Sequence, residues 1–395
     1  MQPIDDLPAG SRVLVRLDLN SPLDDGDVVD NRRFSRHART VSDLLTAGHK
    51  AVLLAHQGRP GRDSFVSLAQ HAELLSDHID QPVGFVDDIH GQTAIDAIQT
   101  LEAGEALLLE NVRMSDDELP ERDPDTHADS ALVQDLAPEV DAYVNDAYSA
   151  AHRKHASLVG FPLVLPAYAG RVMMAEHEAN SSISTRKFEG PVTMVIGGSK
   201  ATDVIGVMEA LDDSVDRFVL GGVAGELFLR AVGHELGYDV GEAQLYDHQW
   251  EKNAEKIRRL LNRNSRIQLP VDLAYEADGR IEREVAAIDS KEVPFLDVGS
   301  RTVEKYAQLI DESAAVFMKG SMGVFEDDQF AYGTVGILEA ISSTDCFSVI
   351  GGGDTSRAIE LHGLDEAQFS HVSIAGGAYI RSLTGQPLPG IDLLE

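Results

Sequence analysis

The sequence of 395 residues contains one cysteine, Cys346, so no disulfide can form within a single chain. This excludes the small secreted domains that depend on disulfides and favours a reducing compartment. No apolar run reaches the roughly 18 residues that a membrane-spanning helix needs. The opening residues, MQPIDDLPAG, lack the basic and apolar regions of a signal peptide. We therefore expect a cytoplasmic protein with no membrane partner.

Positive charge is also scarce in this sequence. The chain has 33 lysine and arginine residues, only nine of them lysine, against 66 aspartate and glutamate residues, for a formal net charge of −33. Without a basic face the protein cannot displace the counterions of a nucleic acid, so nucleic-acid binding is disfavoured. Repulsion among carboxylates is screened in concentrated salt, where the Debye length falls to about 3 Å. The composition predicts a halophilic protein, with an ordinary acidic protein as the alternative.

The chain does contain many short apolar runs separated by segments of helix length. This alternation predicts an α/β fold of two Rossmann-like, three-layer domains with parallel sheets, joined by a helix and hinge. The expected strands are 12–20, 50–58, 82–88, 105–113 and 142–148 in the first half, and 193–198, 217–222, 294–299, 315–320, 347–354 and 371–377 in the second. The expected domains are 1–168 and 187–380, with the connecting helix and hinge at 169–186 and a tail, 381–395, that returns to the first domain.

The residues after the expected strands differ between the two halves. Ligands of parallel sheets bind beyond the carboxyl ends of the strands. In the second half five strands end in glycine, which lets backbone amides at helix N-termini approach an anion. One such glycine pair more often makes a tight turn, but the repetition favours nucleotide phosphates. The glycines are Gly197–Gly198, Gly221–Gly222, Gly320, Gly351–Gly353 and Gly376–Gly377.

Polar and cationic residues follow the strands of the first half. In VRLDLN the period of two turns Arg16, Asp18 and Asn20 to the face opposite the apolar residues. Convergent arginines would bind a small, multiply anionic ligand through paired hydrogen bonds. The alternative is solvated or ion-paired surface arginines, with Asp30 as a partner for Arg32 or Arg33. The further candidates are Arg33, His56, Arg59, Arg113 and Arg153.

The histidines give no sign of a metal site. His37, His71 and His78 fall in segments of helical pattern, and we expect them on the surface. His152 and His155 are spaced like metal ligands, but no cysteine or third ligand stands near them in the sequence, so zinc is disfavoured.

Several motifs, in order along essentially the whole chain, resemble those of the phosphoglycerate kinases. VRLDLNSPL resembles R-x-D-x-N-x-P, DNRRF resembles D-x-x-R-[IF], AHQGRP resembles S-H-L-G-R-P and LLLENVR resembles L-L-E-N-x-R. SAAHRKHAS resembles H-R-x-H-A-S, VIGGSKATD resembles G-G-A-K-x-x-D, and GVFE, GGGDT and LPG follow. The resemblance implies a monomeric glycolytic kinase that transfers a phosphoryl group between 1,3-bisphosphoglycerate and MgADP, giving 3-phosphoglycerate and MgATP, as its two domains close.

The resemblance also implies roles for individual residues. The glycerate substrate would bind to Asp18, Leu19, Asn20, Arg33, His56, Gln57, Gly58, Arg59, Arg113 and Arg153. The nucleotide would bind to Lys200, Lys319, Glu326, Gly352, Gly353, Asp354 and Thr355, with Glu326 on the ribose, Asp354 toward Mg²⁺ and Thr355 on phosphate. The phosphoryl group in flight would be stabilised by Arg33, Lys200, Gly353 and Gly376.

The sequence departs from the family pattern in three places. Val204 stands where the family often has a second lysine, KGSMG replaces N-G-P-M-G, and SIAGGA replaces S-T-G-G-G-A. We expect Lys319 to supply the charge missing at Val204, and a solvated lysine at the rim of the cleft is the alternative. Two other functions are the alternatives. A non-catalytic nucleotide-binding or scaffold protein could keep this fold. A dinucleotide dehydrogenase would need G-x-G-x-x-G after its first strand, and this chain lacks that motif there.

Overall fold

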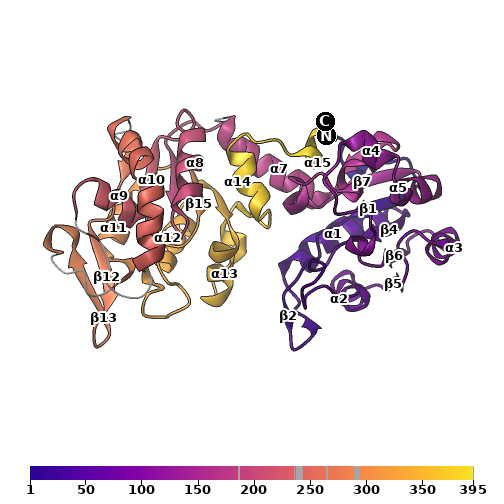
Figure 1. The fold of residues 1–395 in the computed structure, drawn as a ribbon, viewed down its shortest axis with the longest axis horizontal. Helices are drawn as coiled ribbons and strands as arrows, with labels where there is room; N and C mark the ends of the chain where they lie inside the picture. The colour runs from indigo at the N-terminus through magenta and orange to yellow at the C-terminus, as the bar shows by residue number, and fades with distance from the viewer. Residues whose placement is uncertain (186, 235, 237–242, 264–265, 289–293, 395) are drawn as a thin grey trace. The chain divides into compact units, whose positions relative to one another are not determined.

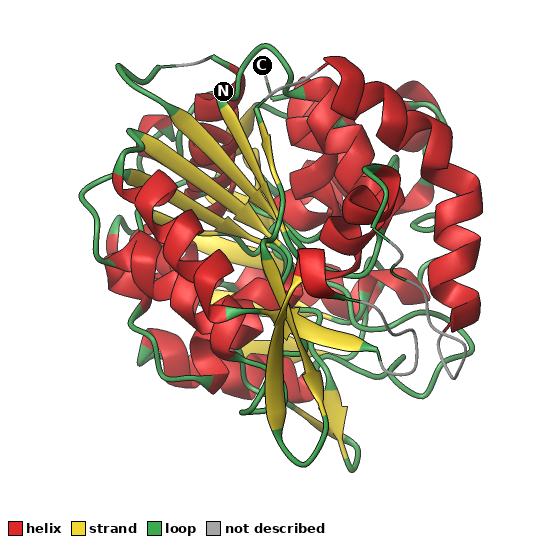
Figure 2. Ribbon diagram, turned by 90° about the vertical axis from the view of Figure 1, so that its left-hand side faces the viewer, coloured by secondary structure: helices red, strands yellow, loops and turns green. Residues whose placement is uncertain are grey.

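The chain folds into two compact units, each built around a parallel sheet (Figures 1 and 2). The computed structural model describes residues 1–395 except 186, 235, 237–242, 264–265, 289–293 and 395. The first unit comprises residues 1–178 and 387–395, and the second comprises residues 179–386. Among the described residues, no helix combines the length and the apolar character needed to cross a bilayer.

The first unit has a six-stranded sheet in the order β5-β6-β4-β1-β7-β8. Its strands are β1 (Arg12–Arg16), β4 (Lys50–Leu54), β5 (Val83–Val86), β6 (Ala106–Leu109), β7 (Ala142–Asn145) and β8 (Ala167–Ala169). Its helices are α1 (Arg32–Thr46), α2 (Ala69–Ile79), α3 (Gln92–Thr100), α4 (Pro124–Ala128), α5 (Ala131–Leu136), α6 (Ala156–Val159) and α15 (Pro389–Asp392), and β2 (Leu23–Asp24) pairs with β3 (Asp27–Val28).

Both faces of this sheet are buried, which makes three layers. Val13 and Val15 pack into one apolar cluster with residues of α1 and α2, while Leu14 packs into another with residues of α3 and α5. Alternate side chains of a strand point to opposite faces, so an apolar run with helices on both sides forms this arrangement. In the register of the sheet, Arg16 lies beside Leu54 of β4 and Asn145 of β7. The carboxyl ends of these three central strands therefore meet at one edge.

The second unit has a six-stranded parallel sheet in the order β11-β10-β9-β15-β16-β17. Its strands are β9 (Val192–Ile196), β10 (Arg217–Leu220), β11 (Ile267–Gln268), β15 (Ala315–Lys319), β16 (Phe347–Gly351) and β17 (His371–Val372). Its helices are α8 (Ala201–Ala210), α9 (Gly222–Ala231), α10 (Ala243–Arg263), α11 (Ser300–Asp311), α12 (Tyr332–Ser342), α13 (Gly353–Leu361) and α14 (Gly377–Leu383).

The expected strand at 294–299 exists but does not belong to the parallel sheet. It forms β14 (Phe295–Val298), which pairs antiparallel with β12 (Asp272–Glu276), and β12 pairs in turn with β13 (Arg280–Glu284). The turn between β12 and β13 contains Asp278 and Gly279, with φ of 52° and 109°. Aspartate followed by glycine is a strong hairpin signal, because both residues tolerate positive φ. The sequence interpretation missed this hairpin and so misplaced the third strand.

The expected helix at 169–184 is α7 (Arg171–Ser184). The division between the two units falls within it, after residue 178. The C-terminal segment 387–395 belongs to the first unit, where the Gly390 amide donates to the Ala151 carbonyl at 2.9 Å and the Gly390 carbonyl accepts from the Asn145 side chain at 3.0 Å.

Candidate functional site

The carboxyl end of the first sheet gathers polar side chains around Asp18. Arg33, in the first turn of α1, and Ser149, in a short turn after β7, both donate hydrogen bonds to Oδ2 of Asp18. Burial opposes the ionisation of Asp18, but the charge of Arg33 and the bond from Ser149 outweigh it, and the pKa of Asp18 lies below its ordinary value. Asp30 accepts from Nε2 of His78 at 2.8 Å instead. The alternative pairing of Arg33 with Asp30 is therefore not observed.

His56 lies beside this carboxylate and is held by a buried arginine. Nη2 of Arg16 is 3.1 Å from Nδ1 of His56, and Nε of Arg16 donates to the hydroxyl of Ser157 at 2.8 Å. Burial lowers the pKa of His56 well below its ordinary value. Because Arg16 can only donate, Nδ1 accepts, and the neutral ring carries its proton on Nε2, which lies 3.9 Å from Oδ1 of Asp18. His56 is thus a hydrogen-bond donor fixed in one tautomer.

Arg16 is itself compensated by a carboxylate that the sequence interpretation did not identify. Oε1 of Glu118 is 3.8 Å from Nη2 of Arg16, and both residues are completely buried. Glu118 also accepts from the amide and the hydroxyl of Ser157, each at 2.8 Å. Glu118 lies in an irregular acidic segment, SDDEL, which gave no pattern that distinguished it from its neighbours.

The remaining predicted glycerate residues surround this centre but do not all face it. Arg113 is buried and donates to the Gly58 carbonyl, and burial lowers the pKa of Arg113 to about 10. Arg59 is exposed and Arg153 is half-buried. Oδ1 of Asn20 accepts from the Gly58 amide at 2.8 Å. This fixes the loop after β4 against the loop after β1.

Two predicted glycerate residues have side chains that point inward. Leu19 is completely buried in an apolar cluster of the first unit. Gln57 is also completely buried, and its amide group exchanges hydrogen bonds with the backbone of Ser21 at 2.9 and 2.8 Å. Any contribution of Leu19 or Gln57 to a ligand is therefore through the backbone.

The expectation that His37 and His71 lie on the surface is wrong. His37 is buried between Asp146 and the backbone amide of Asp18, with its two ring nitrogens 2.8 and 3.3 Å from them. His71 is buried with its Nε2 3.1 Å from Oε1 of Gln57. Both histidines lie on the faces of α1 and α2 that pack on the sheet, where a helical pattern cannot distinguish a satisfied polar residue from a solvated one.

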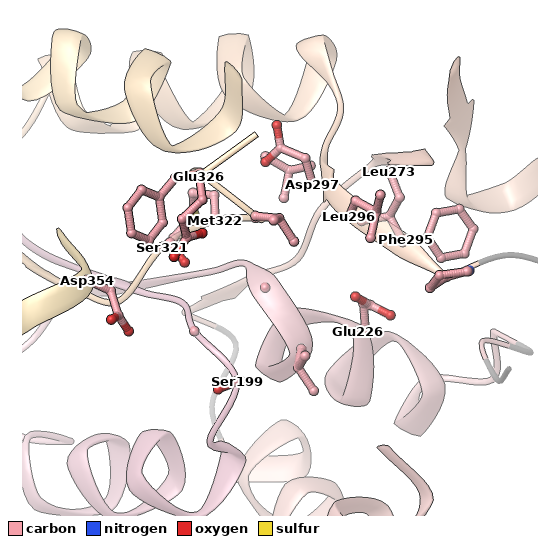
Figure 3. A pocket seen from close by; sticks show the side chains of 18 of the residues that line it. Ser199, Glu226, Leu273, Phe295, Leu296, Asp297, Ser321, Met322, Glu326 and Asp354 are labelled. Carbon is pink, nitrogen blue, oxygen red and sulfur yellow. The ribbon is translucent and has the colours of Figure 1, made fainter. Parts of the chain in front are cut away.

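The second unit contains a cavity of about 720 Å³ at the carboxyl ends of its strands (Figure 3). Figure 3 shows Asp354 and Glu326 toward one end and Glu226 and Phe295 toward the other. Oε1 of Glu326 lies 3.9 Å from Nη1 of Arg357. The lining residues outside the two ends come mainly from the glycine-ended strands, among them Gly198, Ser199, Gly222, Ser321 and Met322. Of the five predicted glycine turns, those after β9 and β10 line this cavity through Gly198 and Gly222, whereas Gly376 and Gly377 are not among its lining residues.

The helix α13 begins at the edge of this cavity. Gly352 precedes it with φ of 101°, a conformation that favours glycine, and Gly353 is its first residue. The hydroxyl of Thr355 accepts from the Gly320 amide at 3.0 Å and donates to the Gly351 carbonyl at 3.1 Å. It therefore joins the ends of β15 and β16 and does not face the cavity. The first-turn amides of α13 are the donors that a helix leaves for a ligand.

Two lysines lie near this helix start. Lys200 occupies the N-cap position of α8 without a side-chain capping bond, and Lys319 ends β15, in register with Ile196 and Gly351. Lys319 is half-buried, and burial lowers the pKa of Lys319. The charge of Lys200 lowers this pKa further, whereas the charges of Asp203 and Asp354 raise it. Lys319 is thus not the fully solvated residue of the alternative interpretation. At the family's usual second-lysine position, Val204 is completely buried.

The other predicted nucleotide groups lie at strand ends of the same unit. Gly376 precedes α14 with φ of 55°. Asp354 is in the first turn of α13. Across the described ranges, no three histidine, cysteine or acidic side chains come together as a metal site. One carboxylate is nevertheless what a Mg²⁺ ion carried by nucleotide phosphates requires, because Mg²⁺ takes most of its ligands from phosphate and water.

Comparison with known proteins identifies the family. The phosphoglycerate kinase family pattern matches residues 4–386. The phosphoglycerate kinase of Halorubrum lacusprofundi is 67% identical over 395 residues, covering 99% of this chain and 97% of that protein. The phosphoglycerate kinase of Haloarcula marismortui is 62% identical over 396 residues, covering 100% and 99%. The crystal structure of phosphoglycerate kinase from Pyrococcus horikoshii OT3 superimposes with a TM-score of 0.91 at 32% identity, covering 100% of this chain and 98% of that one. The chain belongs to the phosphoglycerate kinase family.

Proposed function

We propose that this protein catalyses reversible phosphoryl transfer between 1,3-bisphosphoglycerate and MgADP, giving 3-phosphoglycerate and MgATP. The observation that carries the proposal is the cluster in the first unit, where Arg33 and Ser149 bind the Asp18 carboxylate and Arg16 fixes the tautomer of His56. Such a cluster suits a small ligand that carries both hydroxyl and anionic groups. The family match agrees with this activity and gives no support to the non-catalytic alternative.

The first unit would hold the glycerate. Asp18 would accept from its hydroxyl, while Arg33, Arg113 and Arg153 would bind its carboxylate and phosphate charges, as guanidinium groups do through paired hydrogen bonds. Neutral His56 would donate from Nε2. Arg59 is exposed and would join the ligand from the loop. Asn20 and Gly58 would fix the shape of that loop through their mutual hydrogen bond.

The second unit would hold the nucleotide in the 720 Å³ cavity. Glu326 would accept from the ribose hydroxyls. The amides of Gly353, Asp354 and Thr355, in the first turn of α13, would donate to phosphate. Lys200 and Lys319 would add charge there. Bound Mg²⁺ would neutralise the phosphate chain, with the Asp354 carboxylate as its protein ligand.

The chemistry needs no general base from the protein. In the direction of ATP use the attacking group is the carboxylate of 3-phosphoglycerate, and in the other direction it is a phosphate oxygen of ADP. Neither nucleophile has to lose a proton, so an ionised Asp18 and a neutral His56 can serve as binding groups alone. Catalysis would come from positioning and from charge stabilisation of the equatorial oxygens by Arg33, Lys200 and the amides at Gly353 and Gly376.

The assignment of each substrate to a separate unit has further consequences. The two units must approach each other before transfer, and we propose that residues around 169–186, which include α7, act as the hinge. Approach would also expel the water that otherwise hydrolyses the acyl phosphate. We propose in addition that the protein is a cytoplasmic monomer adapted to high salt. The net charge of −33 and the similarity to proteins of Halorubrum and Haloarcula support the salt adaptation.

A coupled assay tests the proposed activity. The protein is given ATP, Mg²⁺ and 3-phosphoglycerate at about 0.1 and 2 M KCl, and acyl phosphate formation is followed through a reducing dehydrogenase. Circular dichroism at each salt concentration shows whether the chain is folded. We expect turnover that depends on both substrates in the high-salt buffer. A folded protein that turns over in neither buffer would support the non-catalytic alternative instead.

A further inference from the structure

Glu226 is an acidic side chain at the apolar end of the nucleotide cavity. It lies on α9, is 5% exposed and lines the cavity. Figure 3 shows its carboxyl group directed from α9 toward the side formed by Leu273, Phe295 and Leu296. Its neighbours on the helix, Leu227 and Phe228, are completely buried in the core. A carboxyl group among such residues is costly unless hydrogen bonds compensate it.

The orientation of a bound nucleotide follows from the proposed function, on which this inference rests. The helix start at Asp354 and the ribose-binding Glu326 lie toward the end of the cavity opposite Glu226 (Figure 3). A nucleotide anchored there by its phosphates and ribose would extend its base between the apolar residues of the other end. The edge of the base farthest from the ribose would then reach the carboxyl group of Glu226.

The chemistry of a carboxylate limits which base edge it can bind. An ionised carboxylate only accepts, and its two oxygens offer about four acceptor positions, so one carboxylate can accept from a ligand in addition to its partners within the protein. The exocyclic amino group of adenine donates at the far edge of the base, and acidic side chains accept from the corresponding amino group of cytosine. A base with an oxygen at position 6 would place an acceptor at that point, so it would have to bind the carboxylate through other groups of its edge.

We propose that Glu226 accepts a hydrogen bond from the 6-amino group of adenine and thereby selects adenine nucleotides. Glu226 is then a specificity residue for the kinase reaction. Guanine, which carries two N–H donors on its Watson–Crick edge, is the competing base, and preference for it is an outcome of the test.

The test compares the binding of three Mg²⁺ diphosphates by calorimetry in buffer containing about 2 M KCl. These are ADP, purine riboside diphosphate, which lacks the 6-amino group, and GDP. We expect the unaltered protein to bind ADP about tenfold more tightly than either of the others, as the loss of a hydrogen bond to a charged group implies. In Glu226→Leu the preference for ADP over the purine riboside should fall below about twofold. In Glu226→Gln, which keeps one acceptor oxygen and the shape, we expect an intermediate ratio.

A matched variant separates base recognition from general loss of affinity. Glu326→Gln should weaken all three nucleotides by similar factors and leave their ratio unchanged. An unchanged ratio in Glu226→Leu and Glu226→Gln would overturn the inference, as would binding of GDP as tight as that of ADP by the unaltered protein. If the unaltered protein turns over with 3-phosphoglycerate but the Glu226 variants keep the same ratio of nucleotide affinities, only the proposed role of Glu226 is refuted. If it binds none of the nucleotides, the proposed function fails with it.

Discussion

Nδ1 of His37 and Oδ2 of Asp146 lie 2.8 Å apart in the interior of the first unit, and both side chains are buried. The same carboxyl oxygen accepts from the hydroxyl of Thr40 at 2.8 Å. The other oxygen accepts from the amides of Val172 and Met173 at the start of α7, at 2.8 and 3.2 Å. His37 in turn contacts the backbone amide of Asp18. Through His37, Asp146 therefore connects the loop after β1, which contains Asp18, with the first turn of the proposed hinge helix.

We expect Asp146→Asn to lower the free energy of unfolding by about 2–4 kcal/mol, because an amide group would face His37 and Thr40 with a donor where they need an acceptor. Asp135 provides a matched control. Its Oδ2 is also 2.8 Å from a histidine nitrogen, Nδ1 of His90, but that pair is exposed, so Asp135→Asn should cost less than about 1 kcal/mol. Denaturant unfolding at fixed KCl checks both values, and equal losses would refute the special position of Asp146.

Lys319→Asn restores the residue of the family pattern and removes the half-buried charge beside Lys200. We expect it to weaken MgADP binding by about 1–2 kcal/mol, roughly tenfold, without changing the affinity for 3-phosphoglycerate. Lys305→Ala is the control, since Lys305 is another half-buried lysine of the second unit and donates to the Leu269 carbonyl at 3.1 Å. Calorimetric titration of both variants decides, and unaltered MgADP affinity in Lys319→Asn would leave Lys319 without a role in binding.

A lysine at position 204 would not replace Lys319. Val204 is completely buried, so an ammonium group there would have to leave water. We expect Val204→Lys to reduce stability without restoring MgADP binding to Lys319→Asn.

Asp297 in the wall of the nucleotide cavity should make the stability depend on pH. Its Oδ2 accepts from the Gly333 amide at 2.7 Å and from Arg280 at 2.9 Å, yet burial raises its pKa from 3.8 to about 6. At pH values between these two pKa values, Asp297 therefore keeps its proton in the folded protein and has lost it in the unfolded chain. Its contribution to stability is fully present below about pH 4 and is lost as the pH rises through about 6.

Asp297→Asn imitates the protonated group at every pH. Relative to this variant, the unaltered protein should lose at most about 3 kcal/mol of stability between pH 4 and 7, at 1.36 kcal/mol for each unit of pKa shift. Unfolding of both proteins across this range at constant KCl gives the difference. A difference independent of pH would show that Asp297 is ionised throughout.

The excess of carboxylates should make the fold depend on salt. At a net charge of −33, repulsion across the surface opposes the compact state until added ions screen it. We expect the melting temperature to rise as KCl increases from about 0.1 to 2 M. A flat or falling melting temperature would contradict the salt adaptation.

The sequence was most informative where one continuous motif contains both a strand and the functional residues that follow it. VRLDLN predicted both β1 and the side chains beyond it, and MVIGG predicted β9 and its glycine turn. It was least informative where partners come from distant segments. Glu118 compensates Arg16 from a distant segment of the chain, and His37 of α1 contacts Asp146, which follows β7. A helical or irregular pattern cannot specify such pairs, because burial and hydrogen bonding depend on the packed fold.

Glu226 shows the same limit within one helix. Its position after GGVAG predicted only the start of α9, and an isolated glutamate in such a helix is usually exposed. The neighbouring hairpin of β12 and β13, which the sequence interpretation missed, brings β14 and its residues Phe295 and Leu296 to the cavity. The position of Glu226 opposite Phe295 and Leu296 depends on the packed fold and could not be predicted from the sequence of α9 alone.

The rate of phosphoryl transfer in Arg33→Ala is the sharpest check on the proposed kinase reaction. Arg33 is proposed to stabilise the transferring group, so its removal should lower kcat by two to three decades, about 3–4 kcal/mol. Because Arg33 also compensates the buried Asp18, the variant should lose about 1–3 kcal/mol of stability, and the assay must be run well below its melting temperature. Arg39→Ala, at an exposed position of α1, is the control that should keep the full rate. Turnover of Arg33→Ala at the rate of the unaltered protein would refute the proposed role of Arg33. No turnover by the folded unaltered protein with ATP, Mg²⁺ and 3-phosphoglycerate would refute the proposed reaction.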